Sequence, residues 1–297
     1  MRRRGVPVHD GRVDLLFDVA PEPRTGRPPL RIEVAGSRFL LIRQGDEPVL
    51  LGRVDDGNYG VDYVRTGRYR SPVPPIRAAH TAGVAADGGE AWWERWAHHF
   101  RSELSTSGYV PLHAGRWLLS SRAPRLRTLW RWELYTADAD YFYYEGGWPV
   151  LPLRTPAGPG DGRVKAYRKQ ARDGSLAPVL LWWVSGLCGY VVLDGHDRLA
   201  AAIAEDREPP WLELTRVDTD EAAGRTRELV ERYLEHETVI RRHPGTGRAL
   251  AVLGQQFGVD LHKAEHAEAR TRAWPLPGGT AAWTRLASRH APDLAAL

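Results

Sequence analysis

The sequence predicts an α+β fold, and two patterns carry that prediction. Short apolar segments separated by Gly, Pro and Asp fill much of residues 1–147, which is typical of strands. From residue 148 onward, short apolar segments alternate with helical patterns. We expect a β-rich accessory domain over 1–147 with one Trp-rich helix, an α+β module over 148–217, and a helical C-terminal region over 218–297. The 297 residues, 42% of them hydrophobic, suffice for a sizeable core.

The first part is expected to contain mostly strands. They are expected at 30–34, 39–43, 48–51, 115–120, 126–135 and 141–144, with one short strand within 1–28. Residues 53–88 are dominated by Gly, Asp, Pro and Arg and are expected to be loops. The helix is expected over 90–105, where one apolar stripe recurs at helical spacing: Trp92, Trp93, Trp96, Phe100 and Leu104.

The later elements alternate in type. Strands are expected at 150–153, 178–184, 190–193 and 211–217, and helices at 163–172, 199–205, 220–237 and 247–257. Gly174 should end the helix before it. Trp182 and Trp183 are neighbours on one strand, so one ring should face the core and the other the opposite side of the sheet.

Composition excludes several classes of protein. A single cysteine, Cys188, rules out an internal disulfide, a Cys-based zinc site and a CxxC redox pair. No apolar run approaches the length of a membrane span, and no apolar segment follows the basic N-terminus, so we expect a cytoplasmic protein. The formal charge is +4, but the arginines are spread along the chain among Asp and Glu, which argues against a nucleic-acid surface. The sequence leaves the oligomeric state open.

The segment Leu193-Asp194-Gly195-His196-Asp197-Arg198 carries the most chemical information. Gly195 permits a tight turn into a helix, and the free N–H groups of a helix start attract anions. His196 and Arg198 add side-chain donors for phosphate, and Asp194 could hold a metal ion or orient the histidine. A tight turn with an Asp cap and a surface arginine explains the same residues without a ligand.

Residues 193–201 resemble the DGHHR-type box of the ParB/sulfiredoxin superfamily. The order of the surrounding elements, over about residues 148–217, resembles that family as well. The resemblance implies that the box opens a helix holding nucleotide phosphates. It also implies ATP or another nucleotide as cofactor, with Mg²⁺ bridging phosphate oxygens and Asp194 within its reach.

Departures from the family narrow the function. Sulfiredoxins carry their catalytic cysteine where this chain has His196, while Cys188 lies earlier, so sulfinic-acid reduction is disfavoured. The box does not match the GERRxRA-type box of chromosome-partitioning ParB proteins. It is most similar to the DGH-type box of free-amino-acid kinases, which phosphorylate serine. That likeness implies phosphotransfer to the hydroxyl of a small molecule, an amino acid or a biosynthetic intermediate.

The kinase likeness assigns further roles. Those enzymes use an acidic general base near the start of the module, for which Asp161 and Glu145 are candidates by position, although neither lies in a matching motif. Gly195, His196 and Arg198 would clamp the phosphates. Arg163 and Lys165, at the start of the preceding helix, would add positive charge or form a solvated helix face.

Two other functions compete with phosphotransfer. The first is a nucleotide-gated module that binds DNA or a protein without turnover. The second is a zinc-dependent hydrolase, because His262-Lys263-Ala264-Glu265-His266 has the HxxEH order of some metalloproteases. A solvated polar helix explains that segment equally simply.

Overall fold

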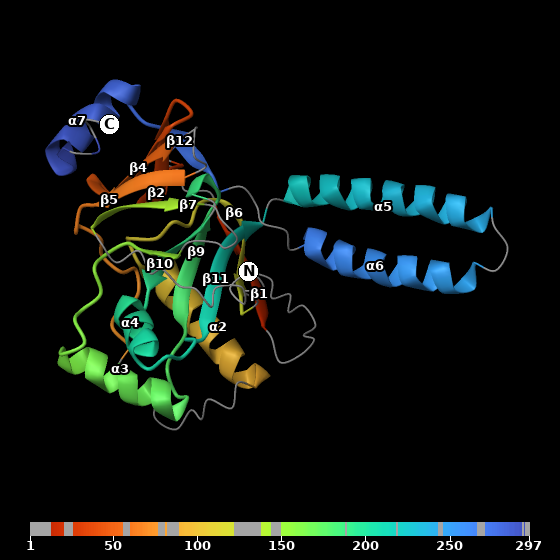
Figure 1. Ribbon diagram of the computed structural model, residues 1–297, viewed down its shortest axis with the longest axis horizontal. Helices are drawn as coiled ribbons and strands as arrows, with labels where there is room; N and C mark the ends of the chain where they lie inside the picture. Colours follow the sequence, from red (N-terminus) through yellow and green to blue (C-terminus); the bar gives the residue numbers. More distant parts are fainter. Residues whose placement is uncertain are drawn as a thin grey trace.

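The computed structural model describes residues 13–20, 26–55, 60–76, 81, 89–121, 138–143, 150–187, 189–217, 219–242, 246–265, 271–292 and 294. Within these residues the strands form two six-stranded sheets. The two sheets lie together in the body of the molecule (Figure 1). Both contribute side chains to one large hydrophobic core. The expected α+β class is therefore confirmed in its coarse form, as helices combined with two mixed sheets.

The first sheet contains the strands of the expected module. Its order is β1 (Asp14–Val19), β6 (Gly115–Ser120), β11 (Trp211–Val217), β9 (Val179–Val184), β10 (Gly189–Asp194) and β8 (Val150–Pro152). β10 runs parallel to β8, and β11 runs parallel to β9. Because the carboxyl ends of parallel strands meet at one edge, the segments that follow β8 and β10 are brought together.

The second sheet is antiparallel except at one edge. Its order is β12 (Ala273–Pro275), β2 (Leu30–Ala35), β3 (Phe39–Gln44), β4 (Glu47–Asp55), β5 (Gly60–Arg65) and β7 (Ala139–Tyr143), with β12 parallel to β2. The expectation of loops throughout 53–88 is wrong at residues 53–55, which belong to β4, and at β5. In β5, Val61 and Tyr63 are buried on one face of the sheet, but a strand of six residues that begins with Gly60 and ends with Arg65 offers little local pattern.

The two sheets cross the expected domain boundaries. β1 and β6, from the expected accessory domain, pair with each other, and β6 also pairs with β11 of the module. β12 and the helix α7 (Gly279–His290), from the expected helical region, lie on the second sheet. Pairing between strands that lie far apart in the sequence determines this arrangement, so it could not be predicted from local composition.

Three helices pack on the module and the core. α2 (Glu90–Thr106) buries most of the predicted apolar stripe, including Trp92, Trp96 and Phe100, whereas Trp93 is only partly buried. α3 (Gly162–Asp173) packs against α4 (His196–Ala204) through small and aromatic side chains. Gly174 ends α3 in the left-handed conformation, at φ 71°, as expected.

The tryptophan pair on β9 divides between two cores. Trp182 belongs to the large core, and Trp183 lies on the opposite face of the sheet with Tyr190. This confirms the expectation from strand alternation. Within the expected helical region, no separate helix was expected at the position of α7, because its buried side includes only Trp283 and Ala287 and the rest is mostly polar. It covers the outer face of the second sheet, where the indole of Trp283 donates to the carbonyl of Leu40 at 3.0 Å.

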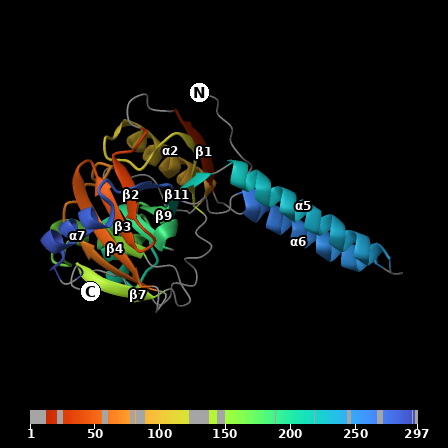
Figure 2. The same ribbon diagram turned by 90° about the horizontal axis from the view of Figure 1, so that it is seen from above.

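A long helical hairpin follows β11. α5 (Thr219–Arg241) and α6 (Gly247–Glu265) lie side by side and project from the body as an arm (Figures 1 and 2). Both begin where the sequence predicts and extend further. Among the described residues, no helix combines the length and the apolar character that crossing a membrane requires.

Candidate functional site

The box lies where β10 ends and α4 begins. Asp194 is the last residue of the strand, Gly195 adopts the left-handed conformation (φ 95°, ψ 20°), and α4 starts at His196. No side chain caps α4. The first N–H groups of this helix therefore keep the electropositive character of a helix start.

Gly195 is required by both conformation and space. A Cβ atom at this position would lie 2.8 Å from Nη2 of Arg198, and its positive φ is unfavourable for other residues. The carbonyl of Gly195 accepts from the N–H of Leu199 at 2.8 Å, which begins the hydrogen bonding of α4. The turn therefore depends on the close approach of the Arg198 side chain.

Arg198 is buried and holds the turn from inside. Its Nη2 donates to Oδ2 of Asp194 at 2.7 Å and to the carbonyl of Pro178 at 2.8 Å, and the residue is only 2% exposed. The predicted role was to clamp phosphate. In this arrangement the guanidinium instead joins the end of β10 to the segment before β9.

Both carboxylate oxygens of Asp194 accept hydrogen bonds. Oδ1 accepts from the hydroxyl of Ser71 at 2.7 Å, and Oδ2 accepts from Arg198. A carboxylate that already forms an ion pair with a buried arginine does not fit the expected direct ligand of Mg²⁺, because a second cation would be repelled. The same engagement leaves Asp194 poorly suited to accept a substrate proton.

His196 is a buried neutral imidazole. Its Nε2 accepts a hydrogen bond of 3.1 Å from the N–H of Leu153, so the proton of the neutral ring lies on Nδ1. Burial, followed by the positive charge of Arg154, lowers the pKa of His196 well below its ordinary value. Nδ1–H is therefore the donor that His196 has left for a ligand.

Asp197 and Arg154 form an ion pair that sequence reasoning missed. Arg154 donates to the two oxygens of Asp197 at 3.1 and 2.9 Å, and the N–H of Ala157 donates to Oδ1 at 2.9 Å. Burial alone would raise the pKa of Asp197, but the hydrogen bonds from Arg154 and Ala157 outweigh it and lower that pKa. Arg163 adds a longer contact, with Nη1 at 3.5 Å from Oδ2.

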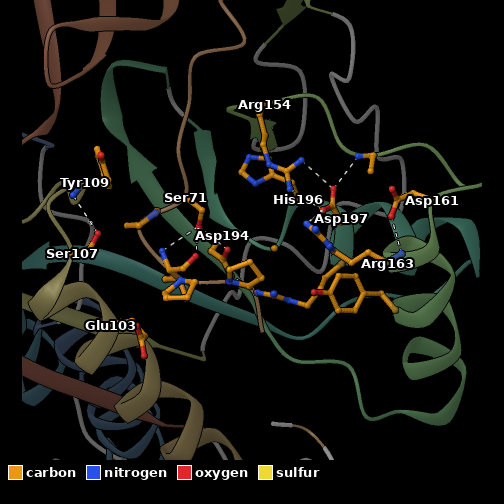
Figure 3. A pocket seen from close by; sticks show the side chains of 18 of the residues that line it. Ser71, Glu103, Ser107, Tyr109, Arg154, Asp161, Arg163, Asp194, His196 and Asp197 are labelled. Atoms are coloured by element: carbon orange, nitrogen blue, oxygen red, sulfur yellow. Dashed lines mark hydrogen bonds and ion pairs between the residues drawn. The ribbon is translucent and has the colours of Figure 1, made fainter. Parts of the chain in front are cut away.

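A cavity of about 820 Å³ opens in front of this turn (Figure 3). The predicted site residues that line it are Asp161, Arg163, Asp194, Gly195, His196 and Arg198. Asp161 caps α3 by accepting from the N–H of Arg163 at 2.8 Å. Lys165 is exposed on α3 and does not line the cavity, whereas Glu145 lies outside the described residues.

The opposite wall of the cavity comes from the last turn of α2 and the loop after it. Glu103, Ser107 and Tyr109 lie there, across from the box in Figure 3. The Glu103 carboxylate is half-buried, and among the described residues its side chain has no ion-pair or hydrogen-bond partner. No local signal in α2 marks this residue, because only the fold brings it to the box.

The remaining candidates fall partly outside the described residues. The backbone of His262 and Glu265 lies in α6, and neither their side chains nor any part of His266 is described. Within the described part of the chain, no three His, Cys, Asp or Glu side chains gather in a way that could hold a metal ion. Cys188 also lies outside the described residues.

Comparisons with known proteins found no relative of this chain. No protein-family description, no characterised protein and no solved structure matches this chain. The likeness to the ParB/sulfiredoxin superfamily therefore rests on the box and on the order of the elements around it.

Proposed function

We propose that this protein binds a nucleotide in the cavity before α4 and transfers its terminal phosphoryl group to the hydroxyl of a small molecule. One observation carries the proposal. The uncapped first turn of α4, entered through a left-handed glycine, opens onto a cavity large enough for a nucleotide. We also propose that the protein contains a ParB/sulfiredoxin-like module and that it is located in the cytoplasm.

The residues of the cavity suggest a division of roles. The N–H groups of the first turn of α4 and Nδ1–H of His196 would hold phosphate oxygens, with Arg163 at the rim supplying positive charge. Arg198 and Asp194 would keep the turn in shape without touching the ligand. Phosphoryl transfer needs mainly such positioning and charge stabilisation.

Two carboxylates can accept the proton of the attacking hydroxyl. Glu103 has no side-chain partner among the described residues, whereas Asp161 is engaged in capping α3. We therefore favour Glu103 over the sequence-based candidate Asp161. The hydroxyl oxygen would attack the terminal phosphorus, the proton would pass to Glu103, and the nucleoside diphosphate would leave.

The test is acceptor-dependent turnover. Purified protein is incubated with ATP, Mg²⁺ and a panel of hydroxyl compounds that begins with serine, and nucleoside diphosphate is measured. Release that depends on one acceptor supports the proposal. Glu103→Gln should then lower turnover by about 100-fold while leaving ATP binding intact, and Asp161→Asn should lower it less.

The α5–α6 arm favours a second candidate, a nucleotide-gated binding module without turnover. The arm extends directly from β11, a strand of the sheet that also holds the box (Figure 2). ATP binding with no acceptor-dependent turnover would favour this candidate. Duplex DNA as its partner would be shown by binding that weakens steeply with salt.

A further inference from the structure

A second cavity lies on the other side of the last turn of α2. Its volume is about 440 Å³, and it is bordered by β1, by the segment before β2 and by residues 110–114. Ser107 and Gly108 border both cavities, so the end of α2 forms a wall between them. In Figures 1 and 2, α2 lies beside β1 on this side of the molecule.

The walls of the second cavity are largely apolar. Phe17 and Val19 of β1 face Leu104 of α2, and Val110 and Leu112 complete this lining. All five side chains belong to the large core or pack against it, so the walls are fixed by the fold. A preformed, mainly apolar hollow of this size is suited to the body of a small organic molecule.

The charged groups around this cavity are mostly cations. Arg27, Arg101 and Arg272 line it, and the only lining carboxylate among the described residues is Asp18. Asp18 already pairs with Arg116 at 3.3 Å. Among the lining side chains that the structure describes, arginines therefore outnumber carboxylates three to one.

Two of these arginines are held by aromatic rings. The guanidinium carbon of Arg272 lies 5.2 Å from the centre of the Trp274 ring, and that of Arg101 lies 5.9 Å from the Phe17 ring. A ring fixes the face of a guanidinium and leaves its edge directed elsewhere. Arg272 forms no ion pair with any residue in the described ranges, so its edge is suited to a carboxylate.

His113 adds a polar group without a charge. It is 7% exposed, its ring meets Trp117 and Trp274 edge to face, and its Nδ1 donates to the carbonyl of Ala114 at 3.1 Å. Burial lowers the pKa of His113 to about 4, so the imidazole is neutral at pH 7. The arginines alone supply the positive charge at this cavity.

We propose that the second cavity is a binding site for a small organic carboxylate with an apolar body, whose carboxylate meets Arg272 and whose body lies between β1 and the end of α2. The site is separate from the box, so it does not rest on nucleotide binding or on phosphotransfer. An aromatic or short acyl carboxylate fits both the apolar walls and the cationic rim.

The experiment is a calorimetric titration of the full chain with 4-phenylbutyrate and with its uncharged amide, 4-phenylbutyramide. We expect saturable binding of the carboxylate with a Kd below about 1 mM, and binding of the amide at least about tenfold weaker. No saturable binding of the carboxylate, or equal binding of the two compounds, would overturn the proposal.

Matched variants locate the binding. Arg272 is exposed, so Arg272→Gln should fold normally and weaken binding by about tenfold. Arg285→Gln, which removes an arginine from a different hollow, should leave binding unchanged. Leu112→Trp should fill the cavity and abolish binding. Equal weakening by Arg272→Gln and Arg285→Gln would show non-specific attraction to a basic protein and would refute the site.

Discussion

Arg154 donates two hydrogen bonds to the carboxylate of Asp197, and the pair joins the end of β8 to the first turn of α4. The Asp197 side chain is 6% exposed, whereas that of Arg154 is 32% exposed. The Asp197 carboxylate is shielded from water, so it relies on Arg154 for hydrogen bonds more than the partly exposed Arg154 relies on Asp197. The pair fixes the orientation of the turn that our functional proposal requires.

Removing Arg154 should destabilise the protein. Arg154→Met leaves a buried carboxylate without its main partner, and we expect the free energy of unfolding to fall by about 2–3 kcal/mol. Urea unfolding at neutral pH measures the change. Arg68→Met, which breaks an exposed pair with Glu47, is the control and should have little effect. Equal effects of the two variants would contradict the importance assigned to the Arg154–Asp197 pair.

Lowering the pH should weaken the ion pair between Arg154 and Asp197. The pKa of Asp197 in the folded protein lies below its ordinary value of 3.8. Its contribution is therefore complete above that value and is lost as the pH falls through the folded pKa. Asp197→Asn should flatten the fall of stability as the pH drops below about 4, measured by urea midpoints. An unchanged acid slope would show that Asp197 is not held in its charged form.

His113 should make the free energy of unfolding depend on pH in a second range, at higher pH than Asp197 does. Its folded pKa of about 4 lies below the ordinary 6.5, so the unfolded chain binds a proton first as the pH falls. Stability should decline from pH 6.5 toward pH 4, and His196 contributes with the same sign. His113→Asn should reduce this slope in unfolding experiments. If His113→Asn left the pH dependence of stability unchanged, this would contradict the conclusion that His113 is a buried, neutral imidazole.

The left-handed turn should not tolerate a side chain. Gly195→Ala places a methyl group against Arg198 and strains the backbone, so we expect a loss of at least about 1–2 kcal/mol in unfolding free energy. It should also disturb the first turn of α4. Gly160→Ala, in a loop with open space and no positive φ, is the matched control. Comparable stability of the two variants would show that the turn can be built without glycine.

The elements marked by local pattern were predictable. The helix stripe of α2, the strand β9 with its divided tryptophan pair, and the turn at Gly195 each depend on residues close in sequence. β5 and α7 were missed because their local signals are weak. The joining of β1 and β6 to the module was missed because strand pairing across the chain leaves no local mark.

The candidate site was predictable only in part. Asp194, Gly195, His196 and Arg198 were found as one segment, but the roles of Asp194 and Arg198 depend on each other and on Ser71, 123 residues before Asp194. Arg154 follows the strand expected at 150–153, but the pairing of that strand with β10, which brings Arg154 to the box, is known only from the structure. Glu103 could not have been found from the sequence, since only tertiary structure brings the end of α2 to the box.

The central claim is that the cavity before α4 binds nucleotide phosphates, and calorimetric titration with ATP and Mg²⁺ tests it most directly. Arg163 lines this cavity and Lys165, two residues later on α3, does not, so the two positions form a matched pair. We predict saturable ATP binding that weakens by about tenfold or more in Arg163→Ala and changes by less than about twofold in Lys165→Ala. Absence of saturable binding to the unaltered chain, or equal loss in both variants, would contradict the account.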